Sequence, residues 1–564
     1  MTVNHTALAA LAAIAVSAPA CAALTISAGA TQNMSCSDGI CVPTAASAVL
    51  NASDLENDLA QFGNMRVMTT GNGVEANNIV VKTSFASPDS TSLTLDAHNA
   101  IVVDAAVSIG SGTAELELQS DTLDAADTLS FGRKGHVTFG SLSDLFGMNG
   151  IVFTLVGSVQ GLASALTANP SGAFALANDY DASGDGTYTQ PPVSTSLAGF
   201  FEGLGNNISN LTISVFTAGG HVGLLADVGS TGLVENLRIA HVSLTLSDEE
   251  GIGGPLAGGN AGRIQRVSAT GEVTNIGAKG GYLGGLVGAN YGTIQWSSSA
   301  AEVGGGTADF GGLVGENDGG TISHSSASGA VSGDGGAGGL VGQNGGTITR
   351  CFATGIVSIA KGSAGGLAGE NGNNVGVISE SYSTGTVSNK GRAQIGGLVG
   401  VNFASGISES YSTGAVVGGN ETWLGGFLGW NYDGTVTQAY STGLVSTSAR
   451  RLIAIVWLRS PTQIDARSYF AVKHPNHRTS EGGFVGYDDS KTGGFSDAYW
   501  DTDTSGITSL SQGAGNISND PGITGLTTEQ FQSGLPSGFD PKIWAEDSSI
   551  NNGFPYLIHN APQK

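Results

Sequence analysis

The sequence predicts an all-β protein that folds as a parallel β-helix, or β-solenoid, and three observations lead to this fold class. Glycine accounts for 90 of the 564 residues, more than twice its usual share of about 7%. A five-residue block, GGLVG or a close variant, recurs along the middle of the chain. Within each repeat, apolar and polar residues alternate over short stretches and show no helical period. The chain is therefore expected to consist of short strands joined by tight turns.

The repeated block sets the length of one structural unit. Its six central copies follow one another after 27, 27, 27, 31 and 29 residues, and a fixed period of this kind is typical of solenoids, propellers and arrays. A propeller blade needs four strands in about 40 to 50 residues, so one solenoid coil per repeat of about 27–31 residues is favoured. The blocks begin at Gly284, Gly311, Gly338, Gly365, Gly396 and Gly425, with a degenerate copy at Gly254 and a late copy at Gly482.

Identical slots in successive repeats predict ladders along the solenoid axis, because coils stack about 4.8 Å apart. An Asn ladder is expected to hydrogen-bond along one turn, and a ladder of β-branched residues is expected to fill the core. The Asn slot holds Asn260, Asn290, Asn317, Asn344, Asn371, Asn402 and Asn431, and the β-branched slot holds Ile264, Ile294, Ile322, Ile348, Ile378, Ile407 and Val436.

Two further slots and the glycines complete the repeat. A small slot holds Ser or Ala in most repeats and Cys351 in one, so this thiol is expected to be buried, unpaired and inert. An aromatic slot follows it directly, with Phe352, Tyr382, Tyr411 and Tyr440. The glycines are expected to supply the positive φ angles of the corners.

The repeats divide the chain into parts. Within the N-terminal part, residues 91–120 alternate like half-buried strands. Residues 45–61 are helix-like and are expected to form an N-terminal cap or a lateral helix. The five predicted parts are a signal peptide (1–22), an N-terminal cap with strand repeats (23–150), lead-in coils (151–250), the repeat β-helix (251–500) and a C-terminal terminator segment (501–564).

The N-terminus predicts export. Residues 7–20 form an apolar run that is too short to span a bilayer and is followed by Ala20-Cys21-Ala22, which has the small residues that a signal peptidase reads. A lipoprotein acylated at Cys21 is the alternative. No later segment has the roughly 18 apolar residues of a membrane-spanning helix. In an exported chain Cys36 and Cys41 are expected to form a small disulfide loop, whereas in a cytosolic chain they would be half of a metal site.

One segment departs from the pattern. Residues 444–481 contain no glycine, and 450–478 hold six of the 21 basic residues. The interval from Gly425 to Gly482 is 57 residues, or two periods, which indicates that one coil has lost its glycine block. A divergent coil, an excursion loop with a basic face and a local frameshift all account for this composition.

The repeat GGLVGxNxGTIxxSYSTGxV, as in residues 396–416, resembles the GLUG motif of large bacterial surface and secreted proteins. The segments at 174–185 and 200–213 resemble the lead-in of such arrays, and those at 498–506, 525–531 and 551–557 resemble their terminator. Residues 91–120 are more loosely similar to the strand repeats of filamentous-hemagglutinin-type adhesins. The resemblance implies a right-handed parallel β-helix in an exported, adhesin-like protein, and it implies no catalytic residues.

Charge and the lack of known export signatures limit the expected partners. The chain carries 21 basic and 46 acidic residues, a net charge of −25, which argues against nucleic acid or an anionic membrane surface as a partner. The chain has no C-terminal run of membrane-barrel strands, so a separate outer-membrane export partner is included among the expected partners.

Clustered carboxylates would indicate a carbohydrate-active β-helix enzyme. Glu380 and Glu409 share a slot in adjacent coils, about 5 Å apart, near the spacing of a retaining glycosidase pair. Glu316 and Glu370 share another slot two coils apart. Other repeats hold Gln, His or Arg in these slots, which favours a solvated polar face. His474 and His477 give only a weak metal motif, so no catalytic, cofactor or metal site is predicted.

The predicted function is adhesion. A secreted or cell-surface solenoid would bind host or neighbour-cell glycans or matrix proteins through its long lateral faces and loops, without enzymatic activity. The alternatives are a carbohydrate-active lyase or glycosidase on a β-helix, and a purely structural fragment of the cell envelope.

Overall fold

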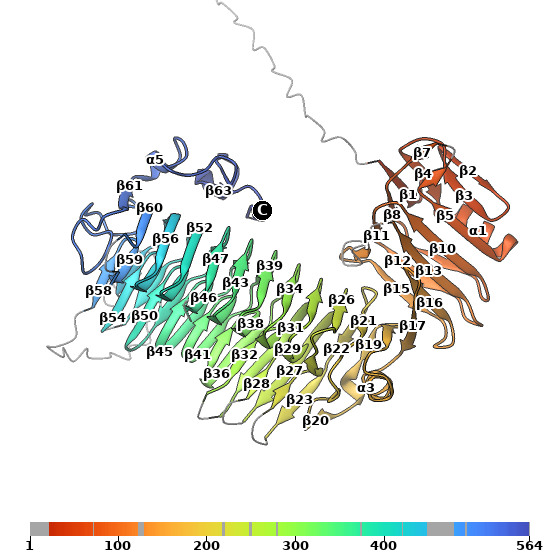
Figure 1. Cartoon of the computed structure of the whole chain (residues 1–564), viewed down its shortest axis with the longest axis horizontal. Coiled ribbons are helices and arrows are strands. Elements are labelled where there is room, and N and C mark those ends of the chain that lie inside the picture. The colour runs from red at the N-terminus through yellow and green to blue at the C-terminus, as the bar shows by residue number, and fades with distance from the viewer. Residues whose placement is uncertain are drawn as a thin grey trace, which may run out of the picture. The chain divides into compact units, whose positions relative to one another are not determined.

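The computed structural model describes residues 22–562 apart from 72, 122–128, 217–219, 248–250, 278–279, 373–374, 420, 448–478 and 491–492. These residues form two compact units, of which the first covers residues up to 135 together with 147–150 and the second covers 136–146 and 151 onward. Both units are built mainly of parallel strands (Figure 1). The predicted signal peptide, apart from its last residue, and the segment 450–478 lie outside the described residues.

The first unit stacks short parallel strands whose side chains alternate between the core and solvent. In β10 (Ser92–Ala97), Leu93 and Leu95 are buried while the residues between them are half exposed. Its two neighbours are β5 (Asn64–Met68) and β13 (Glu115–Ser120). A second sheet contains, in spatial order, β14 (Leu129–Phe131), β11 (Ile101–Val103), β8 (Asn78–Val81), β1 (Ala23–Ser27) and β4 (Ala48–Asn51).

One helix lies near the start of this unit. Helix α1 (Ala52–Phe62) begins because the Asn51 side chain accepts hydrogen bonds from the Ser53 and Asp54 amides, and it ends at Gly63, which has a positive φ. The helix predicted over 45–61 is wrong in its first seven residues, because Ala48–Asn51 pair with β1 as strand β4. The hairpin of β2 (Met34–Ser37) and β3 (Ile40–Pro43) precedes it.

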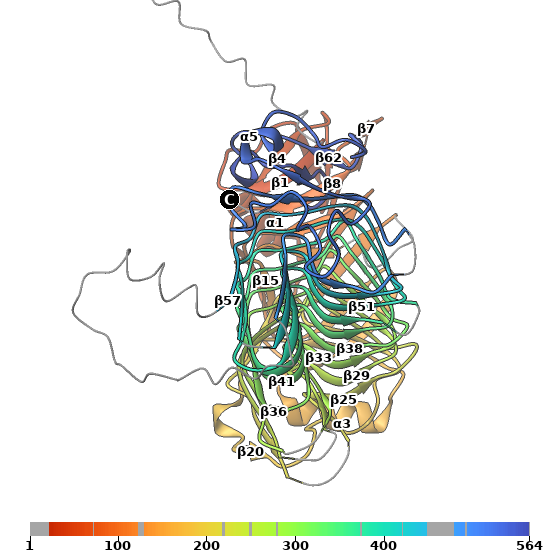
Figure 2. The ribbon, with the colours of Figure 1, turned by 90° about the vertical axis from the view of Figure 1, so that its left-hand side faces the viewer.

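The second unit is a regular solenoid. One coil contains β50 (Ala393–Gly396), β51 (Val399–Phe403), β52 (Gly406–Ser412) and β53 (Val416–Gly418). Each strand pairs in parallel with the equivalent strand of the next coil, β54 (Thr422–Gly425), β55 (Leu428–Tyr432), β56 (Thr435–Ser441) and β57 (Val445–Thr447). The predicted parallel β-solenoid, with one coil per repeat, is confirmed, and Figure 2 shows the coils behind one another.

The stacked strands follow the repeats of the sequence. The strands equivalent to β51 form a nine-stranded sheet with β25 (Leu225–Val228), β29 (Ala257–Asn260), β33 (Val287–Asn290), β38 (Val314–Asn317), β42 (Val341–Asn344), β46 (Ala368–Asn371), β55 and β59 (Val485–Asp488). The strands equivalent to β50 are β24 (His221–Val222), β28 (Ile252–Gly253), β32 (Tyr282–Gly284), β37 (Asp309–Gly311), the C-terminal ends of β41 (Val331–Gly338) and β45 (Val357–Gly365), β54 and β58 (Ser480–Gly482).

The core of the solenoid is the predicted ladder of β-branched residues. All seven residues of that slot, from Ile264 to Val436, are at most 2% exposed. At the N-terminal end of this unit, helix α3 (Val159–Ala168) turns Val159, Leu162 and Leu166 into the same core. This helix was not predicted, although Ser158 as N-cap and the apolar spacing of three and four residues are helix signals.

The strands on either side of residues 448–478 pair directly with each other. Gly425 is in register with Gly482, and Asn431 is in register with Asp488. The interpretation of the 57-residue interval as two coils is therefore wrong, because the coil before the segment stacks on the coil after it.

The C-terminal segment leaves the stack after β60 (Phe495–Asp501) and runs back along one edge of the solenoid (Figure 1). It contains β61 (Ile523–Leu526), α5 (Thr528–Phe531), β62 (Trp544–Ala545) and β63 (Tyr556–Leu557). Within the described part of the chain, no helix is both long and apolar enough to cross a membrane.

Candidate functional site

Two rows of outward-facing side chains run along the solenoid on either side of the glycine block. The residues of each row are in register from coil to coil, because every coil places the same slot at the same point. We call them row A and row B. Row A contains His221, Ile252, Tyr282, Asp309, Gly336, Ser363, Gln394, Trp423 and Ser480, and row B contains Asp227, Gly259, Ala289, Glu316, Gln343, Glu370, Val401, Trp430 and Tyr487.

Contacts between the rows show that they face each other. His221 Nδ1 bonds Asp227 Oδ1 near the start of the rows, and Ser363 Oγ donates to Glu370 Oε1 at 2.7 Å near the middle. Farther along, the rings of Trp423 and Trp430 meet edge to face with centroids 5.3 Å apart. The rows therefore act as one surface, which we call the paired rows.

The glycine blocks allow the backbone to fold tightly between the rows. A Cβ on Gly396 would lie 2.1 Å from the carbonyl oxygen of Val399, and one on Gly397 would lie 2.0 Å from that of Gly426 in the next coil. None of the six central block-initial glycines has a positive φ. The expectation that these glycines supply left-handed corners is wrong, since they are needed because the backbones approach too closely for a side chain.

Non-glycine residues supply the left-handed conformation at another corner of each coil. Their φ angles lie between 42° and 54°, and we call this set the left-handed corner. It consists of Arg266, Trp296, His324, Arg350, Glu380, Glu409, Gln438 and Asp497.

The left-handed corner contains one of the two predicted glutamate pairs. The carboxylate of Glu380 accepts two hydrogen bonds at 3.1 Å from Arg350 Nε and Nη2, so it is held in an ion pair. Trp296 stacks on His324 with centroids 4.0 Å apart. Glu380 and Glu409 thus lie on the polar corner, separate from the paired rows.

The other glutamate pair lies in the paired rows. We call Glu316 and Glu370 of row B, together with Asp309 of row A, the acidic part of the paired rows. Glu316 and Glu370 both belong to row B, with Gln343 between them. Burial raises the pKa of Glu316, and Asp309 and Asp318 add to the shift, while a hydrogen bond with the Tyr282 hydroxyl opposes it. Sequence reasoning missed Asp309, which belongs to row A and so carries no repeat signal shared with Glu316.

The carboxyl group of Asp309 has a strongly raised pKa. Burial raises the pKa of Asp309 to about 6, Glu370 adds to the shift, and the hydrogen bond that the Gly336 N–H donates at 2.8 Å opposes it. A surface pocket of about 460 Å³ lies beside it, lined by Ile252, Tyr282 and Asp309 among others. Asp309 and Tyr282 thus line the pocket, while Glu316 bonds the Tyr282 hydroxyl and Glu370 interacts electrostatically with Asp309. Such an arrangement can bind cationic or hydroxyl-rich groups and transfer protons.

The aromatic part of the paired rows follows two coils later. Trp423 stacks on Tyr487 with centroids 4.6 Å apart, and Trp430 meets Tyr432 edge to face at 5.5 Å. Phe403, which is 42% exposed, stacks on Tyr432 at 4.7 Å. We call these five residues the aromatic cluster: Phe403, Trp423, Trp430, Tyr432 and Tyr487. Trp423 belongs to row A and Trp430 and Tyr487 to row B, while Phe403 and Tyr432 lie beside row B, two residues further along their strands. Their rings lie partly in solvent, where they can contact a ligand.

The predicted Asn ladder lies next to row B, one residue further along each strand, and points inward. Each of its seven residues is fully buried, and the Nδ2 of one Asn donates to the Oδ1 of the next at 2.7 to 3.1 Å. The ladder is therefore a structural element under the paired rows and is inaccessible to a ligand.

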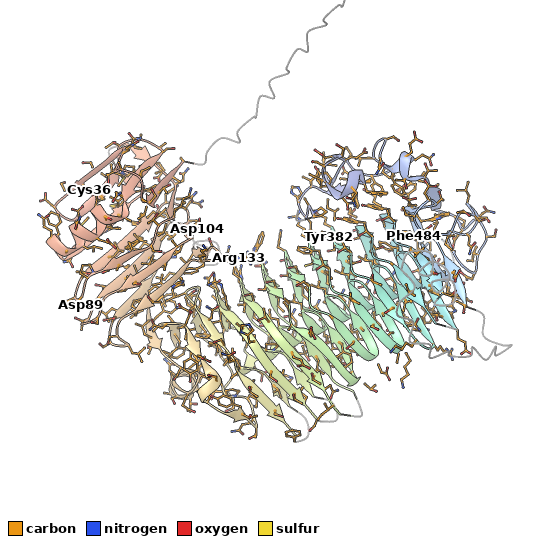
Figure 3. The ribbon with its side chains drawn as sticks, turned by 180° about the vertical axis from the view of Figure 1, so that it is seen from behind. Cys36, Asp89, Asp104, Arg133, Tyr382 and Phe484 are labelled. Atoms are coloured by element: carbon orange, nitrogen blue, oxygen red, sulfur yellow. A yellow bond between two sulfur atoms is a disulfide. The ribbon has the colours of Figure 1, made fainter. Side chains whose placement is uncertain are left out.

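The cysteines take positions that exclude a reactive thiol among the described residues. Cys36 and Cys41 form a disulfide in the β2–β3 hairpin (Figure 3). Their sulfurs also belong, with Asp58, to a close group of potential metal ligands, but the sulfurs are bonded to each other. Cys351 is fully buried without a disulfide partner, and burial raises the pKa of its thiol to about 12.

The C-terminal segment covers the aromatic slot of the repeats. Phe352, Tyr382, Tyr411 and Tyr440 stack with centroids 4.9 to 5.1 Å apart, forming what we call the tyrosine ladder. Phe531, Phe539 and Trp544 of the segment pack on this ladder, and Asn560 Nδ2 donates to the carbonyl oxygens of Cys351 and Glu380. Figure 3 shows Tyr382 beside the segment. The three tyrosines of the ladder are at most 2% exposed and are thus closed to ligands.

The class of protein is defined by the coil and its motif. Residues 306–332 match the family described as the GLUG motif, and the same slots recur in register in the neighbouring coils. The chain therefore contains a β-solenoid of GLUG repeats.

Halomucin is a curated protein with a similar sequence. Over 108 residues, or 19% of this chain, the sequence is 36% identical to halomucin from Haloquadratum walsbyi, and the chain covers 1% of that protein's length.

Two solved structures are similar at low scores. One is a candidate immunoglobulin A1 protease from Bacteroides ovatus, with a TM-score of 0.30 and 16% identity, covering 72% of this chain and 93% of that one. The other is described as an IgA1 protease, with a TM-score of 0.29 and 16% identity, covering 56% of this chain and 26% of that one. Likenesses at these TM-scores carry no conclusion about activity.

Proposed function

We propose that this chain is part of an exported surface solenoid that adheres to glycans through the aromatic cluster of the paired rows. The carrying observation is that five aromatic side chains from three successive coils gather on an outward face, with Phe403 42% exposed. Aromatic faces and edges pack on the apolar C–H surfaces of sugars, while their polar atoms and neighbouring carboxylates bond hydroxyl groups. The GLUG motif and the similarity to halomucin support a surface or secreted location.

The charge of the paired rows defines the class of glycan. Neither row contains Lys or Arg, whereas row B carries Asp227, Glu316 and Glu370. Anionic sugars such as uronic or sialic acids would be repelled by these carboxylates and by the net charge of −25. We therefore expect neutral or amino sugars to bind.

A glycan array probed with the full chain tests the proposal. The wild type is expected to bind neutral or amino-sugar glycans, and Trp423→Ala with Trp430→Ala should lower the signal at least tenfold. Trp296→Ala is the matched control, because Trp296 is 50% exposed on the left-handed corner. The proposal is overturned if no glycan binds, or if the control variant loses as much binding as the double variant. A parallel array of matrix proteins tests protein adhesion separately.

The acidic part of the paired rows favours a second candidate function, a carbohydrate-active enzyme. Burial raises the pKa of Asp309 to about 6, and a carboxyl group with such a pKa can act as a general acid near neutral pH. Burial also raises the pKa of Glu316. The enzyme would release new reducing ends from a polysaccharide, and Glu316→Gln would abolish their release. If the wild type and Glu316→Gln release the same trace amounts of reducing ends from a panel of neutral polysaccharides, the enzyme candidate is rejected and adhesion without catalysis is favoured.

A further inference from the structure

The Asn ladder ends on a carboxylate. Asp488 occupies the Asn slot of the last coil, in register with Asn431, whose Nδ2 donates to Asp488 Oδ1 at 3.1 Å. The slot is an amide in each of the seven preceding coils from Asn260 to Asn431. The last coil therefore has a carboxylate where the preceding coils have an amide. The hydrogen bonds of the ladder do not by themselves call for this charge.

A second buried carboxylate faces Asp488. Asp520 belongs to the loop between β60 and β61; it is 8% exposed, and Asp488 is 4% exposed. Burial, the charge of Asp488 and a hydrogen bond with the Asp488 carboxyl group raise the pKa of Asp520 to about 7. Asp520 Oδ2 has no hydrogen-bond partner within the described structure. The two carboxyl groups can share a proton, but Asp520 Oδ2 is still buried without a hydrogen-bond partner, which is costly. A cation held between the two carboxylates would remove this cost.

The groups around the pair fix the geometry of Asp488. Ser490 donates two hydrogen bonds to its carboxylate, from Oγ to Oδ2 at 2.8 Å and from the N–H to Oδ1 at 3.2 Å. The side chain of Asn516 bonds the backbone of Asp488 on both sides, at 2.8 Å to its N–H and 2.7 Å to its carbonyl oxygen. No ion pair joins Asp488 or Asp520 to a Lys, Arg or His among residues that the structure describes.

We infer that Asp488 and Asp520 bind a divalent cation, with Ca²⁺ as the expected ion, and that this ion fastens the loop 511–522 to the last coil. Carboxylate and hydroxyl oxygens are ligands for hard cations, and Ca²⁺ accepts irregular sets of six to eight oxygens better than Mg²⁺ does. Extracellular modules bind Ca²⁺ with Kd values of about 10⁻⁴ to 10⁻³ M. The expected affinity rests on the surface location given under the proposed function, but the site itself does not require glycan binding.

Calorimetry of the full chain with CaCl₂ as the only titrant tests the site. The wild type is expected to bind one Ca²⁺, and Asp488→Asn and Asp520→Asn should each weaken binding at least tenfold. Asp488→Asn introduces the residue that the slot holds in each of the seven preceding coils, so it should fold. Asp318→Asn, which removes an exposed carboxylate at a distant coil corner, is the matched control and should bind as the wild type does.

Hydrogen exchange distinguishes a cation from a shared proton. At a Ca²⁺ concentration ten times Kd, exchange of amides in 511–522 should slow about tenfold, following the factor 1 + [L]/Kd. The inference is overturned if the wild type gives no saturable Ca²⁺ binding, if binding survives in both variants, or if exchange responds to pH near 7 but not to Ca²⁺. Glycan binding is no readout here, so either proposal can fail without the other.

Discussion

The same coils carry aromatic residues on two sides, and these residues are buried on one side and exposed on the other. Tyr411, in the tyrosine ladder, is fully buried beneath the C-terminal segment, whereas Phe403, eight residues earlier in the same coil, is 42% exposed in the aromatic cluster. Both stack on an aromatic residue of the next coil, at 5.0 Å and 4.7 Å. Stacking is therefore common to both sides, and covering by the C-terminal segment is what makes one of them structural. An aromatic ladder in such a solenoid can therefore be a binding face only where no other part of the chain covers it.

The largest effect is expected when the covered ladder is interrupted. Tyr411→Ala removes a ring that contacts Tyr382, Tyr440 and Trp544, and a buried aromatic truncation costs about 3–5 kcal/mol. The C-terminal segment should then become sensitive to limited proteolysis, and the urea midpoint should fall. Phe403→Ala is the control and should cost less than about 1 kcal/mol. Equal losses in the two variants would contradict the distinction between the covered and open sides.

A smaller but clear effect is expected at the glycine block between the rows. In Gly397→Ala, the new Cβ would lie 2.0 Å from the Gly426 carbonyl oxygen and 2.8 Å from Ser412 Oγ, and overpacking of this kind costs about 1–3 kcal/mol. Gly406→Ala in the same coil is the matched control, since its nearest atom would be 3.8 Å away and its φ is not positive. Chemical denaturation should separate the two variants by at least 1 kcal/mol. If they unfold alike, close backbone approach is not the reason for the glycine block.

These glycines also mark how far the sequence could predict the fold. The Asn and Ile ladders were predictable because stacking places equivalent residues of successive coils next to each other. A residue that recurs in one slot is therefore the neighbour of its own copy in the next coil. The reason for the glycines was not, because a glycine required by close approach and one required by positive φ look the same in sequence. The left-handed corner holds Trp296, His324 and Glu380, which share no side-chain property that could signal a backbone angle.

The site was less predictable than the fold, for a related reason. Glu316 and Glu370 were visible as one slot, but Asp309 belongs to the facing row and meets them only after the chain bends at the glycine block. The contacts of Tyr440 with Asn551 and Pro555 join residues more than 100 positions apart that share no repeat. Sequence periodicity predicts contacts between equivalent positions of successive coils. It gives no information about contacts between positions that are not equivalent.

Removing a single hydroxyl group should change the stability differently at two positions of the tyrosine ladder. The Tyr440 hydroxyl donates to the Pro555 carbonyl oxygen and accepts from Asn551 Nδ2 at 2.8 Å, so Tyr440→Phe should cost about 1 kcal/mol. The buried Tyr411 hydroxyl has no hydrogen-bond partner in the described structure, so Tyr411→Phe should be neutral or slightly stabilising. Proteolysis of the C-terminal segment and the urea midpoint measure both. A larger loss in Tyr411→Phe than in Tyr440→Phe would show that hydrogen bonds from the segment do not help to close this side.

An effect of pH is also expected, and it should arise on the open side. Because burial raises the pKa of Asp309 to about 6 from its usual 3.8, the folded chain binds this proton more tightly than the unfolded chain does. The stabilising contribution is fully present below pH 3.8 and is lost as the pH rises through 6. Asp309→Asn should remove this part of the pH dependence between pH 4 and 7, measured by hydrogen exchange at Gly336, whose N–H bonds Asp309 Oδ1. Asp318→Asn, an exposed neighbour on the next turn, is the control and should leave it in place. An unchanged pH profile in Asp309→Asn would mean that Asp309 is ionised throughout this range, and that the acidic part of the paired rows holds no proton to transfer at neutral pH.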